Sequence, residues 1–211
     1  MDTTLKHSLI TLTILAGLSR VPAASAQQAR MAGGSSTMVG KESKAEFDAQ
    51  NQKGAAAVGA VKATPAKLSA ADQKLLMEVA KGGLMQLEVS KVAAQKATNP
   101  AVRQLAQAEV TEQTGLSAKL KEMATAKGIT LPATPDAKTK ALVTELQAIS
   151  GKAFDKMYVL ESGVKGHEKL DKVMTTVEAS SADASLKGVG KAAHPLVKTH
   201  LKVAYQIMDT L

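Results

Sequence analysis

Histidine and glutamate residues on the inward faces of predicted helices are the residues of this chain best suited to chemistry. Apolar residues recur at helical spacing through 99–128, and Glu109 falls in the middle of that stripe, with Glu112 at its edge. His167 and His200 fall on the stripes of two later helices, whereas Glu88 sits beside the apolar face of an earlier one. An unpaired carboxylate or imidazolium is costly to bury, so we expect these groups to find partners in one another.

Imidazole and carboxylate groups that converge from different helices are also how four-helix bundles hold metal ions. Such a set suits iron, manganese or zinc. The candidate ligands are Glu88, Glu109, Glu112, His167 and His200. The Glu-x-x-His motif of di-iron bundles is absent from the sequence, so a buried polar cluster without metal stays open as the alternative.

Start and stop signals from Ser69 onward predict the helices that position these groups. Caps, glycines and prolines predict long helices over 69–97, 99–128, 151–179 and 182–211, and a short helix over 136–148. Short loops favour an antiparallel four-helix bundle over 69–211 in an all-α fold. Gly163, Gly166 and Pro195 flank the two histidines, which indicates either tight helix packing with a kink or a local widening for a ligand.

The N-terminal region predicts export. Lys6 and His7 precede an apolar run over 8–19, and small residues at 24–26 form a cleavage pattern, so residues 1–26 are predicted to be a signal peptide. Residues 27–68 are rich in small residues without an apolar period and are predicted to be a flexible low-complexity linker, with a short helix over 42–52 as an alternative within it. The mature protein is expected to be periplasmic or secreted, either free or peripheral to the envelope, with no transmembrane segment.

Composition excludes several classes of function. The 211 residues include no cysteine, which excludes disulfides and thiolate metal sites. Aromatic residues make up only 2%, and the lysines behind the net charge of +8 (27 − 19) alternate with acidic residues, so no nucleic-acid partner is expected. Weak attraction to polyanionic envelope material remains an option. The sequence contains neither a Gly-x-Ser-x-Gly elbow nor a phosphate-binding loop, which leans against an enzyme.

Several short motifs occur together in one order. They lie at 81–93, 99–106, 128–132, 151–158, at His167 and at 195–201. Over about residues 70–206 this set resembles an exported bacterial family, domain of unknown function four-one-four-two (DUF4142), whose members often carry the label outer-membrane protein. The resemblance implies a ferritin-like bundle with no established reaction. Its pattern carries over onto Glu88, Phe154, Asp155, Tyr158, His167 and His200.

One position departs from the family pattern. Where the family has Asp-His in the second long helix, this chain has Glu112 and Gln113. Glutamine is a poor metal ligand and cannot act as a base. The first functional hypothesis is therefore an exported helical bundle with a non-catalytic binding or structural role toward an unknown envelope component. The alternative is a ferritin-like metal-binding or redox protein with a degenerate histidine–carboxylate site; the oligomeric state is not predicted.

Overall fold

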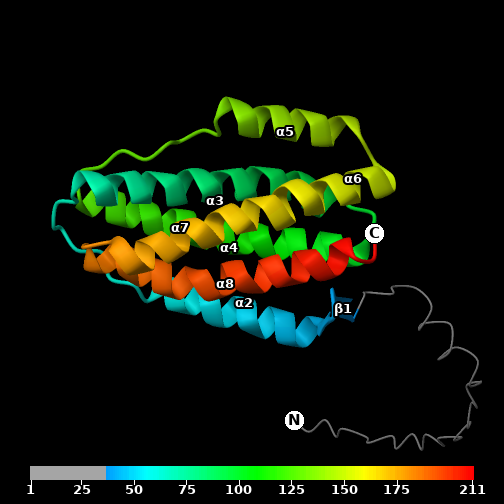
Figure 1. The fold of residues 1–211 in the computed structure, drawn as a ribbon, viewed down its shortest axis with the longest axis horizontal. Helices are drawn as coiled ribbons and strands as arrows, with labels where there is room; N and C mark the ends of the chain where they lie inside the picture. Colours follow the sequence, from blue (N-terminus) through cyan, green and yellow to red (C-terminus); the bar gives the residue numbers. More distant parts are fainter. Residues whose placement is uncertain (1–36) are drawn as a thin grey trace, which may run out of the picture. The chain divides into compact units, whose positions relative to one another are not determined.

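The computed structural model describes residues 37–211, so the signal-peptide prediction over 1–26 lies outside the described residues. Within them the protein is mostly helical, as the sequence predicts (Figure 1). The elements are β1 (Met38–Val39), β2 (Glu42–Ser43), α2 (Lys44–Gly59), α3 (Ala70–Lys96), α4 (Pro100–Ala126), α5 (Ala137–Ala148), α6 (Gly151–Tyr158), η1 (Val159–Gly166), α7 (His167–Ser180) and α8 (Ala184–Met208).

Side-chain caps fix where the helices begin. Ser69 accepts a hydrogen bond from the backbone N–H of Asp72 at 3.0 Å and opens α3. Asn99 accepts from Ala101 at 2.8 Å and opens α4, with a proline at the first helical position. Gly128 follows α4 with φ +68°, a conformation that glycine adopts without strain. The predicted helix boundaries therefore agree closely with the observed ones.

The path of the chain differs in one respect from an all-antiparallel bundle. Short connections reverse the chain between α3 and α4 and between α7 and α8 (Figure 1). However, α5 runs along α3 back to the far end of the molecule, so α6 and α7 point in the same direction as α4. The predicted extra short helix, α5, is thus the crossover connection that makes the segment α6–α7 parallel to α4. The segment predicted as the third long helix is continuous over 151–180 but contains the π-helical stretch η1.

Two apolar clusters share the core, and the polar residues lie where they meet. The first cluster includes Leu105, Val159 and Val203, and the second includes Leu116, Leu170 and Val197. Three helical segments contribute residues to both clusters: α4, the segment from η1 into α7, and α8. Glu109, His167 and His200 lie where these segments pass from one cluster to the other.

Residues 27–68 are predicted to be a flexible linker. The described part of this region, 37–68, instead contains the packed helix α2. Ser43 and Glu46 form a capping box that opens α2, and α2 packs along α8 and α4. Phe47 enters the first apolar cluster and Val58 the second. A β-carbon on Gly54 would come within 2.2 Å of Leu196, so small residues allow the close approach. Single large residues among alanines and glycines give little apolar period, which is why the sequence pattern predicted at most a short helix over 42–52 and did not predict the length or the packing of α2.

Replacing Val58 with alanine is expected to lower the free energy of unfolding by about 2 kcal/mol, because it removes buried methyl groups and leaves a cavity. Urea unfolding followed by circular dichroism measures the change. The matched control is Gln52→Ala, an exposed position on the same helix, for which we expect a change within about 0.5 kcal/mol. Equal effects of the two variants would contradict the packed position of α2.

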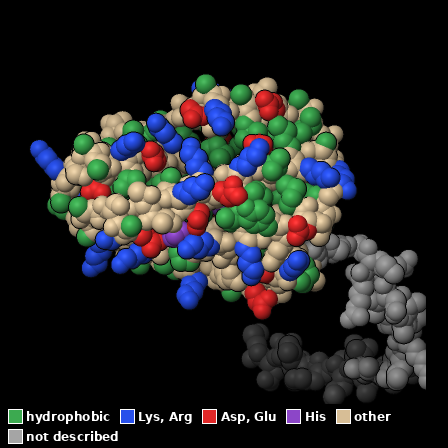
Figure 2. Space-filling model, viewed as in Figure 1, with side chains coloured by type: hydrophobic (Ala, Val, Ile, Leu, Met, Phe, Trp, Pro, Cys, Tyr) green, Lys and Arg blue, Asp and Glu red, His purple; other side chains and the backbone are tan. Residues whose placement is uncertain are grey.

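The described surface mixes charges of both signs. Figure 2 shows lysine and acidic side chains interspersed over one face, as expected from the alternation in the sequence. Between residues 37 and 211 no helix is long and apolar enough to cross a membrane.

Candidate metal centre

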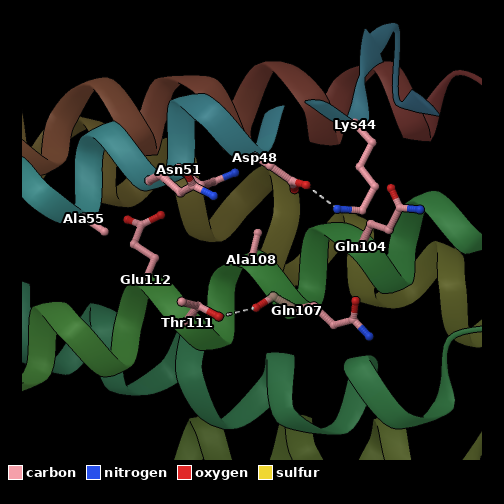
Figure 3. Close-up of a pocket in the computed structure, with 10 residues that line it drawn as sticks. Lys44, Asp48, Asn51, Ala55, Gln104, Gln107, Ala108, Thr111 and Glu112 are labelled. Atoms are coloured by element: carbon pink, nitrogen blue, oxygen red, sulfur yellow. Dashed lines mark hydrogen bonds and ion pairs between the residues drawn. The ribbon is translucent and has the colours of Figure 1, made fainter. Parts of the chain in front are cut away.

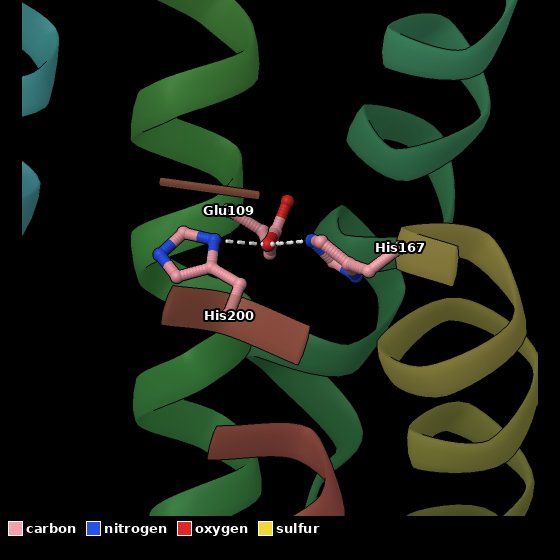
Figure 4. Close-up of side chains that lie close together, drawn as sticks. All are labelled: Glu109, His167 and His200. Carbon is pink, nitrogen blue, oxygen red and sulfur yellow. Dashed lines mark hydrogen bonds and ion pairs between the residues drawn. The ribbon is translucent and has the colours of Figure 1, made fainter. Parts of the chain in front are cut away.

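A carboxylate oxygen and two imidazole nitrogens meet between three helices. Glu109 comes from α4, His167 is the first residue of α7, and His200 lies in the second half of α8. Oε1 of Glu109 lies 2.6 Å from Nε2 of His167 and also accepts a hydrogen bond from Nδ1 of His200. One ligand atom from each residue lies within 4.8 Å of the other two, and both rings point at Glu109 (Figure 4). All three residues are at most 1% exposed.

The outer nitrogen of His200 is held by α2. Nε2 lies 2.6 Å from Oδ1 of Asn51, an acceptor, so Nε2 carries a proton and donates it. Phe47, one turn earlier on α2, packs against the same ring with the ring centroids 5.5 Å apart. Because the outer nitrogen is protonated, Nδ1 is the atom available to bind a proton or a metal ion beside Glu109.

The π-helical stretch η1 shapes the surroundings of His167. Nδ1 of His167 lies 3.0 Å from the carbonyl oxygens of both Ser162 and Gly163, and 2.8 Å from Nε2 of Gln86. At the end of η1 the backbone N–H of His167 bonds the carbonyl oxygen of Val164, three residues back, instead of that of Gly163, its usual α-helical acceptor. The carbonyl oxygens of Ser162 and Gly163 face the imidazole.

The neighbours of Nδ1 of His167 are of two kinds, one amide donor and two carbonyl acceptors. When the Gln86 amide donates to Nδ1, Nε2 carries the proton and donates it to Glu109. When Nδ1–H donates to the two carbonyl oxygens, the Gln86 amide must turn away, and Nε2 presents its lone pair toward Glu109, as a metal-ligating histidine does. Gln86 also bonds Ser162, donating to its carbonyl oxygen at 3.1 Å.

Glu112 and Gln113 border the centre from α4. Oε2 of Glu112 lies 3.1 Å from Nδ1 of His200, but neither carboxylate oxygen of Glu112 accepts a hydrogen bond from a described residue. Nε2 of Gln113 lies 3.5 Å from the second oxygen of Glu109, a long hydrogen bond. Glu112 is therefore at hand as a further oxygen ligand, whereas Gln113 supports Glu109 only weakly.

Burial and mutual charge set the proton affinities of the centre. Burial by itself raises the pKa of Glu109, but His167 and His200 outweigh it and hold that pKa well below its usual range. Burial lowers the pKa of His200, but Glu109 and Glu112 together raise it to about 9. Burial raises the pKa of Glu112 to about 7 against the attraction of His200, with Glu109 adding to the rise. At neutral pH, Glu109 and His200 are therefore a carboxylate–imidazolium pair.

Glu88 and His194 lie outside the centre. The structure does not bring Glu88, one of the predicted ligands, to the centre, because Glu88 pairs with Lys91 at 2.7 Å and its side chain is 32% exposed. It lies at the edge of the apolar face of α3, where a long side chain reaches solvent. His194 is also buried, but its two nitrogens bond carboxylates on opposite sides, Glu178 at 2.5 Å and Asp171 at 2.8 Å.

The fold and this cluster define an all-α protein that buries a histidine–carboxylate centre between its helices. The chain belongs to the family of the domain of unknown function DUF4142, whose family model matches residues 57–207. This match confirms the family that the short motifs indicated. It begins within α2, ahead of the boundary at residue 69 that the sequence predicted for the bundle. No curated protein and no solved structure matches the chain.

Proposed function

We propose that this protein is an exported, ferritin-like helical bundle that binds one divalent transition-metal ion at Glu109, His167 and His200. The observation that carries the proposal is that one ligand atom from each of the three residues lies within 4.8 Å of the other two, with the outer nitrogen of His200 held by the oxygen acceptor of Asn51. Protein metal sites orient their histidines in this way. Export is supported by the signal pattern over 1–26, and the ferritin-like arrangement by the single crossover through α5.

The ligand types limit the metal. Two imidazoles with one or two carboxylates suit zinc, iron or manganese, and the lack of thiolate disfavours softer ions. Three protein ligands leave coordination positions for Glu112 or for small molecules. An ion bound there would supply Lewis-acid or one-electron chemistry, while the protein residues exclude bulk water and fix the imidazole orientations.

A buried polar cluster held together by protons alone is the competing interpretation, and it fits a non-catalytic structural role. In its favour, Glu109 already accepts hydrogen bonds from both histidines. Elemental analysis of residues 27–211 purified without chelator, followed by titration with ferrous iron, manganese and zinc, separates the two. We expect about one ion per chain. Protein that neither carries nor takes up any of these metals would leave the polar cluster as the function of these residues.

Metal affinity is expected to rise with pH. The pKa of His200 is raised to about 9, so at neutral pH a metal ion must displace the proton on its Nδ1. Displacement of this one proton predicts an apparent affinity that rises about tenfold per pH unit between about pH 7 and about pH 8.5. Isothermal titration calorimetry in buffers of different ionisation enthalpy measures the protons released. A pH-independent affinity would contradict His200 as a ligand.

A further inference from the structure

A pocket between α2 and α4 ends beside the centre. It encloses about 270 Å³ and is lined by polar side chains from both helices (Figure 3). Asn51 and Glu112 belong both to this pocket and to the surroundings of His200. The other two described pockets contain no side chain in contact with the centre. The pocket therefore leads from the α2–α4 surface to the edge of an otherwise buried site.

Glu112 marks the inner end of this pocket. Its side chain is only 5% exposed, and Figure 3 shows its carboxylate pointing from α4 toward α2, near Asn51 and Ala55. Neither oxygen accepts a hydrogen bond from a described residue. A buried carboxylate in that state is costly, so Glu112 is stabilised by binding either a proton or a cation. His200 is the cationic partner of Glu112 on one side, and the pocket gives a metal ion access to Glu112 from the other.

Oxygen ligands continue outward from Glu112. Asn51 is one turn along α2 from Asp48, whose carboxylate is 45% exposed at the pocket mouth and pairs with Lys44. A divalent cation that displaces Lys44 from Asp48 would thus meet one carboxylate at the mouth of the pocket and a second, Glu112, at its inner end. These carboxylates raise the local concentration of cations, and Lys44 at the mouth opposes them.

We infer that this pocket is the entry route for the metal ion and that Glu112 is the transfer ligand that carries the ion from the pocket to Glu109 and His200. This inference rests on the proposed function. It assigns Glu112 a kinetic role, distinct from that of the ligands that hold the ion. A transfer ligand changes association and dissociation rates together, whereas a permanent ligand changes the equilibrium affinity.

The test follows the uptake of Co²⁺, a coloured probe for such sites, by its visible absorption in a stopped-flow instrument. We expect Glu112→Gln to slow uptake by about tenfold. Ala55→Leu, which fills the pocket and changes no group of the centre, is expected to slow uptake and release together, so that the equilibrium affinity is nearly unchanged. Ala56→Leu is the matched control, because Ala56 is an exposed neighbour on α2 that does not line the pocket.

The outcomes separate the two proposals. Wild-type protein that binds no Co²⁺, iron, manganese or zinc overturns the proposed function. Wild-type protein that binds metal, with uptake rates unchanged in both Glu112→Gln and Ala55→Leu, overturns only the entry route. A large loss of equilibrium affinity in Glu112→Gln, with Ala55→Leu unaffected, also overturns it and makes Glu112 a permanent ligand. Circular dichroism of each variant ensures that the rates refer to folded protein.

Discussion

Changing His167 and His200 together to alanine is expected to reduce metal binding from about one ion per chain to none at micromolar concentrations. The change removes both nitrogen ligands and leaves Glu109 alone among the three residues that share the centre. A lone carboxylate does not retain zinc, iron or manganese against water, because affinity in such sites comes from several ligands held in place together. Elemental analysis after dialysis, together with calorimetric titration, measures the loss.

His194 provides the control for this experiment. It is a buried histidine on α8 like His200, but its nitrogens bond Asp171 and Glu178 on opposite sides, so these three groups cannot surround one ion. His194→Ala is therefore expected to keep full metal binding, although it removes two charge-assisted hydrogen bonds. Metal loss in His194→Ala equal to that in the double variant would mean that folding damage, rather than the missing ligands, accounts for both.

The sequence predicts the inward residues of the long helices because burial follows the helical period. Glu109 interrupts the apolar stripe of α4, and His167 and His200 interrupt theirs, so the helical period alone places each of them in the core. Caps such as Ser69 and Asn99 act through local hydrogen bonds, which is why the helix starts could also be predicted. The helical period does not predict whether a side chain at the edge of an apolar stripe is exposed or buried. Both Glu88 and Glu112 lie at such an edge, but Glu88 points outward and Glu112 points inward.

Contacts between distant segments are the part that the sequence does not reveal. Asn51 holds the outer nitrogen of His200 across 149 positions of chain, and it lies in a segment with too little apolar pattern to predict a packed helix. Gln86 lies on α3, and nothing in its local sequence indicates that its amide meets His167. The π-helical stretch depends on packing around η1, although Gly163 and Gly166 marked the place. A β-carbon on either glycine would lie 3.0 Å or less from a neighbouring side chain.

In the metal-free protein, Glu109→Leu is expected to lower the free energy of unfolding by about 3–5 kcal/mol, the usual cost of removing one partner from a buried ion pair. Oε1 of Glu109 is the common acceptor for both histidines, and the region between the two apolar clusters offers them no bulk solvent. Without that carboxylate, the imidazolium of His200 keeps only Glu112 nearby and must lose its proton or draw in water. Urea unfolding at pH 7 with excess chelator measures the loss. Glu88→Gln, a change at an outward glutamate, is the control and is expected to stay within about 0.5 kcal/mol.

Replacing all three residues with leucine distinguishes the electrostatic cause from a simple packing defect. If the cost of Glu109→Leu comes from imidazoles left without a counter-charge, the variant with Glu109, His167 and His200 all changed to leucine should recover much of the lost stability, because apolar groups often replace a buried ion pair with little cost. If the cost comes from the shape of leucine at position 109, the triple variant should be less stable than the single one. Recovery of stability together with loss of metal binding would show that these residues are retained at the expense of stability, as expected for a functional site.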